Sequence, residues 1–479
     1  IILYTLMIRS RFFNIISELS PLEVKQFSAN IRGLVPKKDN LLVHLFENLH
    51  TQITKDPFSI DEYKLFKSYY GKRQYNASLL RVRLSQLYKL LNDFLAIKEN
   101  GQEAGIFNST SALKYYRANH HDELFSKYLS DTFEKIEALP FRNEKYFDYL
   151  YKVQLEYYYF ESSRKREGPY NVSEIDLSID SCYFIRKLKH IVRIFNLREF
   201  DKTAQDTQAF LFILSVTSQN PIFNNNAVLN FYLTLAEYYI DGEKENNFKN
   251  AMIVFFENEN LFSLDEGRDN YIILVNIAIR KINLGIERYR RILFNLYERA
   301  LERKYLLENN IISRFSYRNI VETALKLEKY SWADNFIIKY KQNLQPAYRN
   351  FIYSFEKSRI LSEQKKFSEA LSFIANISFE DVLLELACRL ERVKIFIGLQ
   401  DIELAEYHLK SMVSYIKRNK YFGYQQEYYL NFCKYLLKWI NIQSTNKHKV
   451  MALFESIQKE EKIIDKKWLM DKCKQLILS

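Results

Sequence analysis

Basic side chains at helical spacing are the residues of this chain best suited to chemistry. Arg186, Lys189 and Arg193 are three and four residues apart, so a helix places them on one face. Arg288 and Arg291, in a later segment, are three residues apart. Facing a groove, these five residues would bind a phosphate or another anionic group of a partner. If they face water instead, they are ordinary solvated side chains on the outer faces of their helices.

A second basic set, nearer the start of the chain, indicates a different chemistry. A short helix that stops at Gly71 and a longer helix that starts near Asn76 fit a helix-turn-helix motif. In that motif the second helix enters the major groove of DNA, and basic side chains contact phosphates and bases. The alternatives are a structural cap for the helices that follow and a docking domain for a partner. The residues concerned are Lys72, Arg73, Arg81, Arg83 and Lys89.

Motifs that would indicate catalysis are missing from the sequence. It contains no glycine-rich phosphate loop of the form GxGxxG or GxxxxGK[ST], and no HExxH zinc motif. His120 and His121 are neighbours, but adjacent residues of a helix point in different directions, so they do not suggest a metal site. We therefore predict that the protein is not an enzyme and that it uses no metal or cofactor.

The elements that must position these residues are helical hairpins that repeat along the second half of the chain. The clearest units carry an aromatic or aliphatic residue three positions before an alanine, at the close crossing of two helices. The clearest pairs are Tyr330/Ala333, Phe367/Ala370 and Ile402/Ala405, and weaker ones are Phe248/Ala251 and Ile286/Tyr289. The alanines of the three clearest pairs are 37 residues (370 − 333) and 35 residues (405 − 370) apart. Such a period is typical of stacked helical arrays.

These units resemble tetratricopeptide repeats (TPRs). Phe367, Ala370 and Ile374 match the start, the small and the large positions of that family's second helix, and Ser358 matches a small position of its first helix. The tryptophan of the first helix and the proline after the second helix are absent, and the spacing is irregular. The resemblance implies a TPR-like solenoid whose first helices form an extended groove for a protein or peptide. The chain as a whole also resembles large bacterial helical-repeat proteins, a resemblance that implies no activity.

Composition supports an all-α chain in a reducing compartment. The 479 residues include 10 Gly and 7 Pro, where average usage would give about 34 and about 24. The four cysteines are far apart and lie in apolar surroundings, which predicts reduced core thiols and a cytoplasmic protein. The sequence has no run of about 20 apolar residues, so no transmembrane helix is expected. A net charge of +12 permits nucleic acid as a partner without demanding it. The cysteines are Cys182, Cys388, Cys433 and Cys473.

Several helix ends can be predicted from local signals. Capping boxes at Ser20–Glu23 and Ser59–Glu62 each predict the start of a helix. The long helix that begins near Asn76 is expected to end near Lys98, before a break at Asn100–Gly101. The last helix is expected to run from Lys449 to the end. The sequence leaves open whether translation starts at Met7.

The predicted organisation has four parts. Residues 1–100 form a compact four-helix unit, 101–230 form long helices with degenerate repeats, 231–415 form the TPR-like repeats and 416–479 form capping helices. The function predicted from this organisation is a non-catalytic scaffold that binds a protein or peptide and no membrane. The alternative is a nucleic-acid-associated regulator, with the helix-turn-helix as its DNA-binding head and the solenoid as its partner arm.

Overall fold

The computed structural model describes residues 12–34, 41–55, 60–197, 208–219, 226–241, 243–375, 377–378, 381–419, 425–442 and 447–478. Within these ranges the regular structure is helical except for one short antiparallel hairpin, in which β1 (Leu307–Glu308) pairs with β2 (Ile311–Ile312). The all-α prediction is therefore confirmed. The chain divides into two compact units, unit 1 (Ile1–Arg186) and unit 2 (Lys187–Ser479). Across the described ranges, no helix has the length and apolar character needed to cross a membrane.

Unit 1 begins with a small helical core. Its helices are α2 (Pro21–Leu34), α3 (Leu41–Lys55), α4 (Glu62–Tyr70) and the first half of α5 (Ala77–Ala118). Phe27 of α2 packs edge-to-face on Phe46 of α3, and Leu87 of α5 is fully buried beside them. The predicted capping box is confirmed at α2. The Ser20 backbone N–H donates to Glu23 Oε2 at 2.6 Å, and the Glu23 N–H donates to Ser20 Oγ at 3.3 Å.

The start of α4 differs from the prediction. Ser59 lies outside the described residues, and the helix begins at Glu62 with Asp61 as its cap. The Asp61 carboxylate accepts the Lys64 backbone N–H at 3.0 Å. The other limits are as expected, since Gly71 ends α4 with a φ of +63° and the Asn76 side chain caps α5. An aspartate next to the first turn took the capping role that we predicted for the serine two residues earlier.

The long helix α5 does not end near Lys98. It continues through Asn100 and Gly101 to Ala118, so the predicted helix end is wrong. A glycine inside a helix costs only about 1 kcal/mol relative to alanine, and packing at both ends of α5 outweighs that cost. Its first half belongs to the core described above, and its second half buries Ile106 and Leu113 in another. The division into four parts stays a prediction.

The second core of unit 1 is formed by α5, α6 (Asp122–Glu137) and α7 (Glu144–Ser162). Phe125 of α6 and Phe160 of α7 stack at its centre, with ring centroids 4.0 Å apart and an interplanar angle of 7°. Helix α8 (Val172–Leu197) follows and continues across the boundary into unit 2.

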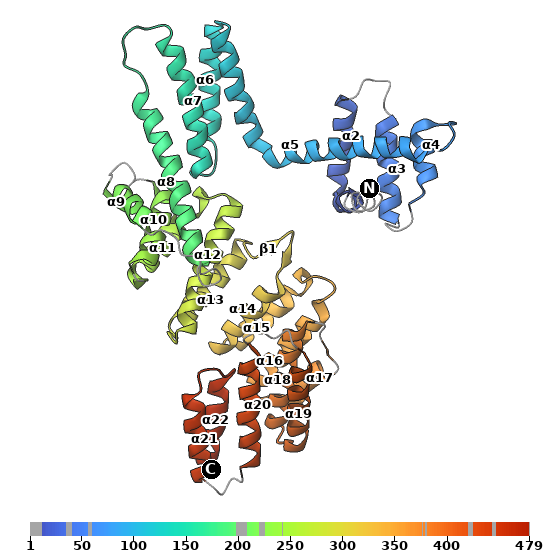
Figure 1. Ribbon diagram of the computed structural model, residues 1–479, viewed down its shortest axis with the longest axis vertical. Helices are drawn as coiled ribbons and strands as arrows, with labels where there is room; N and C mark the ends of the chain where they lie inside the picture. Colours follow the sequence, from blue (N-terminus) through green and yellow to red (C-terminus); the bar gives the residue numbers. More distant parts are fainter. Residues whose placement is uncertain are drawn as a thin grey trace. The chain divides into compact units, whose positions relative to one another are not determined.

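Unit 2 is built from consecutive helices that pack against one another in pairs (Figure 1). The pairs are α10 with α11, α12 with α13, α14 with α15, α16 with α17, and α18 with α19, and each pair also contacts the next. This arrangement is compatible with a helical-repeat solenoid. The bounds are α9 (Gln208–Gln219), α10 (Ala227–Ile240), α11 (Glu245–Glu257), η3 (Glu259–Leu261), α12 (Leu264–Asn283), α13 (Tyr289–Glu302), α14 (Arg314–Lys326), α15 (Tyr330–Lys339), η4 (Lys341–Asn343), α16 (Arg349–Glu363), α17 (Phe367–Ile374), α18 (Val382–Gly398), α19 (Ile402–Arg418), α20 (Gln425–Asn441), α21 (Lys447–Lys459) and α22 (Lys466–Leu478).

Small residues lie where the paired helices cross, as the repeat pattern predicts. The alanines of the four units that carry one are fully buried: Ala251, Ala333, Ala370 and Ala405. Ser358 is also fully buried, and its hydroxyl donates to the Ala370 carbonyl at 2.8 Å, which joins α16 to α17. A Cβ added at Gly398 would lie 2.5 Å from the Phe367 ring, so this glycine permits a close approach as well.

Two features of unit 2 were not predicted. The expected last helix from Lys449 is two helices, α21 and α22, because residues 460–465 break the helical path between them. The β1–β2 hairpin was missed altogether. Its two-residue turn consists of Asn309 (φ +48°) and Asn310 (φ +63°), a conformation that asparagine tolerates better than most residues.

Candidate functional site

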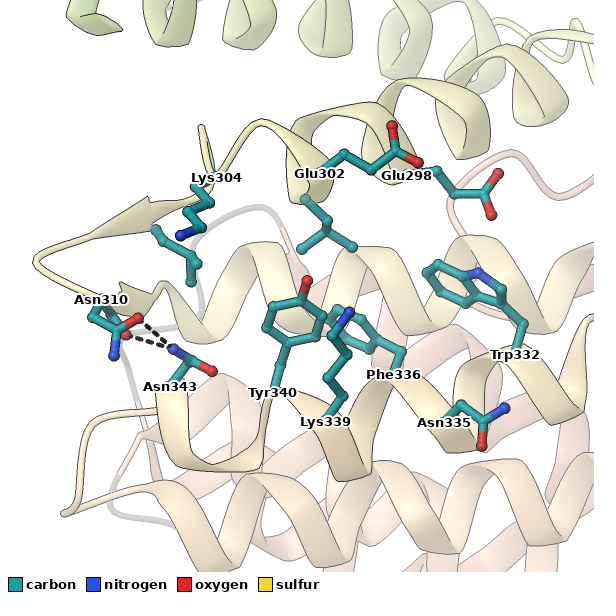
Figure 2. Close-up of a pocket in the computed structure, with 12 residues that line it drawn as sticks. Glu298, Glu302, Lys304, Asn310, Trp332, Asn335, Phe336, Lys339, Tyr340 and Asn343 are labelled. Atoms are coloured by element: carbon teal, nitrogen blue, oxygen red, sulfur yellow. Dashed lines mark hydrogen bonds between the residues drawn. The ribbon is translucent and has the colours of Figure 1, made fainter.

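A groove of about 600 Å³ lies in unit 2 between α13, the β1–β2 hairpin and α15 (Figure 2). Its volume falls within the range of about 300–1,000 Å³ that is usual for ligand sites. Both flanking helices are the second members of their pairs, whereas the sequence analysis placed the binding groove on the first members. Its lining residues are Glu298, Leu301, Glu302, Lys304, Leu307, Asn310, Trp332, Asn335, Phe336, Lys339, Tyr340 and Asn343.

Three aromatic rings line the α15 side of the groove. Trp332, Phe336 and Tyr340 are four residues apart, so they follow one face of the helix. The Trp332 and Phe336 rings stack with centroids 5.5 Å apart and an interplanar angle of 2°. The Phe336 and Tyr340 centroids are 5.2 Å apart. Phe336 is buried while Trp332 and Tyr340 are half-buried, so the row of rings remains partly open to the groove.

Helix α15 therefore has two apolar faces: one packs in the core, and the other lines the groove. Ala333 and Ile337 are fully buried and fix the helix to its neighbours. Phe336 of the aromatic row is itself buried and packs on Tyr317 of α14 with ring centroids 5.0 Å apart, so only the two outer rings of the row are partly open. A helix that needed only to cover a core would carry one apolar stripe. The second stripe is what gives the groove its aromatic wall.

Two carboxylates face these rings from α13. Glu298 and Glu302 are four residues apart and both line the groove. The arginines nearest to them in sequence are held elsewhere, since Arg299 and Arg303 lie 3.1 Å and 2.9 Å from Glu259 Oε2. Glu259 is itself buried. In the described part of the chain, no ion pair or hydrogen bond engages the Glu298 or Glu302 carboxylate.

The other end of the groove carries amides and basic groups. Asn343 Nδ2 donates to the Asn310 carbonyl at 2.8 Å and to Asn310 Oδ1 at 3.0 Å, which ties the turn of the hairpin to the end of α15. Lys304 lies near this end, whereas Lys339 lies near the centre of the groove, beside Tyr340 and Phe336 (Figure 2). The groove thus has an acidic end beside Trp332 and an amide-rich, basic end beside Asn310.

The basic residues that we predicted as a binding site on α8 lie beside carboxylates of the chain itself. Arg186 is exposed, and its guanidinium is 3.9 Å from Asp148. Arg193 is 3.4 Å from Asp269, also at the surface. Lys189 is different, because its side chain is 13% exposed and its Nζ lies 2.9 Å from the buried Glu266 carboxylate. That pair has a structural role in the interior of unit 2.

The remaining two predicted residues belong to α13 and the turn before it. Arg288 forms an ion pair with Glu245 of α11, and Arg291 is exposed. None of the five predicted residues lines the groove described above. Whether they bind a partner stays a prediction.

In the N-terminal basic set, the two arginines of α5 lie in different surroundings. The Arg83 Nε donates to the Tyr70 hydroxyl at 3.3 Å, and its guanidinium lies 4.9 Å from the Tyr69 ring centroid. Lys72, Arg73, Arg81 and Lys89 are exposed. The connection between α4 and α5 has six residues, 71–76, whereas a helix-turn-helix usually has three or four. Contact with DNA stays a prediction without further support.

The cysteines are reduced and buried, as predicted. All four have free thiols in the interior of the protein: Cys182, Cys388, Cys433 and Cys473. Burial raises the pKa of the Cys388 and Cys433 thiols to about 12 in each case. Thiols of this kind do not react readily as nucleophiles. Among the described residues, no cluster of three or more histidine, cysteine or acidic side chains could hold a metal ion.

A second charged region joins the first helices of two neighbouring pairs, α14 and α16. Arg318 Nε lies 3.3 Å from Glu356 Oε1, and Arg359 Nη1 lies 2.9 Å from Glu356 Oε2. Arg359 also forms an ion pair with Glu322. We call these four residues the interhelix charge network. Glu356 is fully buried, so each of its oxygens depends on an arginine of the network.

The pKa shifts in the interhelix charge network follow from burial and pairing. Burial raises the pKa of the Glu356 carboxyl. At Glu322 burial also acts to raise the pKa, but the charges of Arg359 and Lys326 outweigh it and lower the pKa to about 2. Glu322 therefore stays ionised through the acidic range and holds the Arg359 guanidinium in place.

The geometry thus separates a network of mutually paired charges from a groove in which Glu298 and Glu302 form no ion pair with the described part of the chain.

Comparison of the chain with protein-family models, curated proteins and solved structures found no match in any of the three.

Proposed function

We propose that the protein is a non-catalytic, TPR-like scaffold that binds a short segment of a partner protein in the groove between α13 and α15. The observation that carries the proposal is the row Trp332, Phe336 and Tyr340, which is partly open to the groove although α15 already buries another face in the core. Tryptophan and tyrosine are enriched among the residues that dominate binding energy at protein interfaces. The buried, free thiols fit a reducing compartment such as the cytoplasm.

A peptide suits the spacing of the groove. The ring centroids are 5.5 Å and 5.2 Å apart along α15, and alternate side chains of an extended peptide are about 6.6 Å apart on one side. Because the middle ring, Phe336, is buried, the side chains of such a peptide would contact the two half-buried rings, Trp332 and Tyr340. The Asn335 amide can donate to and accept from a peptide backbone, whereas Asn343 can only accept through its Oδ1, because its Nδ2 already donates to Asn310.

The alternative function, a nucleic-acid-associated regulator, has less support. Arg83 packs on tyrosines of α4, and α5 serves as the common helix of both cores of unit 1. Arg81 and Arg83 are two residues apart and therefore point to different sides of α5. No feature of the described residues favours this alternative over the groove.

Site-specific photo-crosslinking tests the proposal. Benzoylphenylalanine placed at Asn335, in the groove, should yield a discrete crosslinked partner in lysate of the source organism. The matched control carries the same group at Glu369, an exposed residue of α17. The crosslink should be lost when Trp332→Ala is added while the far-ultraviolet circular dichroism is unchanged. Equal crosslinking from both positions, or none from Asn335, would contradict the proposal.

A further inference from the structure

We infer that the acidic end of the groove binds an arginine side chain of the partner peptide, between the Glu298 and Glu302 carboxylates and the Trp332 ring. The inference rests on the proposed function and specifies the chemistry of its ligand. The opposite end of the groove is lined by Lys304 and amides, so a cation of the peptide is expected at the Trp332 end (Figure 2).

The first step of the argument is the pair of carboxylates on α13, which form no ion pair with the described part of the chain. Like charges four residues apart on a helix repel each other, so Glu298 and Glu302 lower the stability of α13 unless a cation lies between them. Arg299 and Arg303 pair with the buried Glu259 instead, so Arg299 attracts Glu302 without forming an ion pair with it. A cation from outside the chain would relieve the repulsion.

The second step is the aromatic surface beside these carboxylates. Tryptophan is the best side chain for attracting a cation to its ring face. The same aromatic cluster already accepts a cation from within the chain, because the Lys329 ammonium lies 4.6 Å from the Phe294 ring centroid. Phe294 in turn contacts Trp332. The ligand cation would extend that arrangement along the row of rings.

The third step decides which cation fits. A hydrated metal ion would need about six oxygen ligands, and the two carboxylates supply only part of such a set beside apolar rings. A guanidinium is planar, stacks on aromatic rings and donates two parallel hydrogen bonds to a carboxylate. Lysine could pair with the carboxylates but would lack the stacked, forked geometry. Arginine is therefore the expected residue.

Selection from a phage-displayed library of random dodecapeptides on the immobilised full-length protein tests this inference. The wild-type protein should select peptides with arginine at one fixed position. A selected peptide, labelled with fluorescein, should bind Glu298→Gln/Glu302→Gln at least about tenfold more weakly in an anisotropy titration. The charge-matched control Glu369→Gln/Glu403→Gln changes exposed residues of α17 and α19 and should bind within about twofold of the wild type. Selection on Glu298→Lys/Glu302→Lys should favour aspartate or glutamate at the same position.

The possible failures are distinguishable. Peptides that need Trp332 but carry no fixed arginine, or whose arginine is indifferent to Glu298→Gln/Glu302→Gln, would overturn this inference and leave the proposed function standing. A fixed lysine in place of arginine would overturn the stacked guanidinium geometry. If no selected peptide depends on Trp332, the proposed function fails together with the inference.

Discussion

The interhelix charge network and the groove use the same residue types in opposite ways. In the network, Arg359 joins Glu322 and Glu356, and Arg318 completes the set. In the groove, Glu298 and Glu302 face aromatic rings, while the arginines beside them turn to Glu259. Residue type alone therefore does not distinguish a structural charge from one available to a ligand. The distinction lies in whether another part of the chain already neutralises it.

The strongest way to test this comparison is to break the network at its centre. Arg359→Met leaves Glu322 without its main partner and the buried Glu356 with one arginine instead of two. Removal of one partner from a buried ion pair typically costs about 3–5 kcal/mol, so we expect a loss of that size in the free energy of unfolding. Urea denaturation measures it. The matched control is Arg291→Met, an exposed residue, which should change stability by less than about 0.5 kcal/mol. Equal effects of the two variants would mean that the network does not stabilise the fold.

A second test concerns the packing that brings the network together. Ala370 is fully buried where α16 and α17 cross, and its carbonyl accepts the Ser358 hydroxyl. Ala370→Leu should lower the free energy of unfolding by about 1–3 kcal/mol, because the larger side chain forces the helices apart. Ser372→Leu, two residues further along α17 and exposed, is the control and should be nearly neutral. A neutral Ala370→Leu would contradict the close crossing predicted from the repeat pattern.

The network also predicts a dependence on pH. The pKa of Glu322 is lowered to about 2 in the folded protein from an ordinary value of 4.5. A lowered carboxyl pKa contributes stability that is fully present above the unfolded value and is lost as the pH falls toward the folded value. The difference in urea midpoint between wild type and Glu322→Gln should therefore be largest above about pH 5 and shrink toward pH 2. A difference that grows toward pH 2 would have the wrong sign. Glu369→Gln should show no such change.

The smallest expected effect is at the surface of α8. Arg186 is 56% exposed on its side chain and 3.9 Å from Asp148, and an exposed pair of this kind contributes about 0–1 kcal/mol. Arg186→Gln should therefore alter the urea midpoint of unfolding far less than Arg359→Met does. A loss as large as that of Arg359→Met would contradict the contrast between exposed and buried pairs. If the variant abolished binding of the partner, the basic site predicted from sequence would regain support.

Local signals in the sequence predicted local structure well. The Ser20–Glu23 capping box and the Asn76 cap depend on residues within one helical turn, and the buried Ala370 depends on the helix that directly precedes its own. The end of the long helix was mispredicted because the packing on both sides of Gly101 is set by residues distant in sequence. The double asparagine at Asn309–Asn310 was a turn signal that the sequence analysis overlooked.

The candidate site was beyond the sequence analysis for a related reason. The aromatic row on α15 interleaves with the core residues Ala333 and Ile337, and only the packing decides which stripe is buried. The partners of the basic residues are just as remote, since Lys189 pairs with Glu266, 77 residues away. Three aromatic residues at four-residue spacing beside a separate small-residue stripe are the signal that would have found the groove.

The central claim is that the groove binds a partner through the aromatic row, whereas the interhelix charge network only holds the fold. Isothermal titration of a peptide selected on the wild-type protein into Trp332→Ala and into the wild type tests it most directly. We expect the variant to bind at least about 30-fold more weakly, which corresponds to about 2 kcal/mol for an anchor residue of an interface. Its helical circular dichroism should match that of the wild type. Equal affinity for the two proteins would contradict the claim.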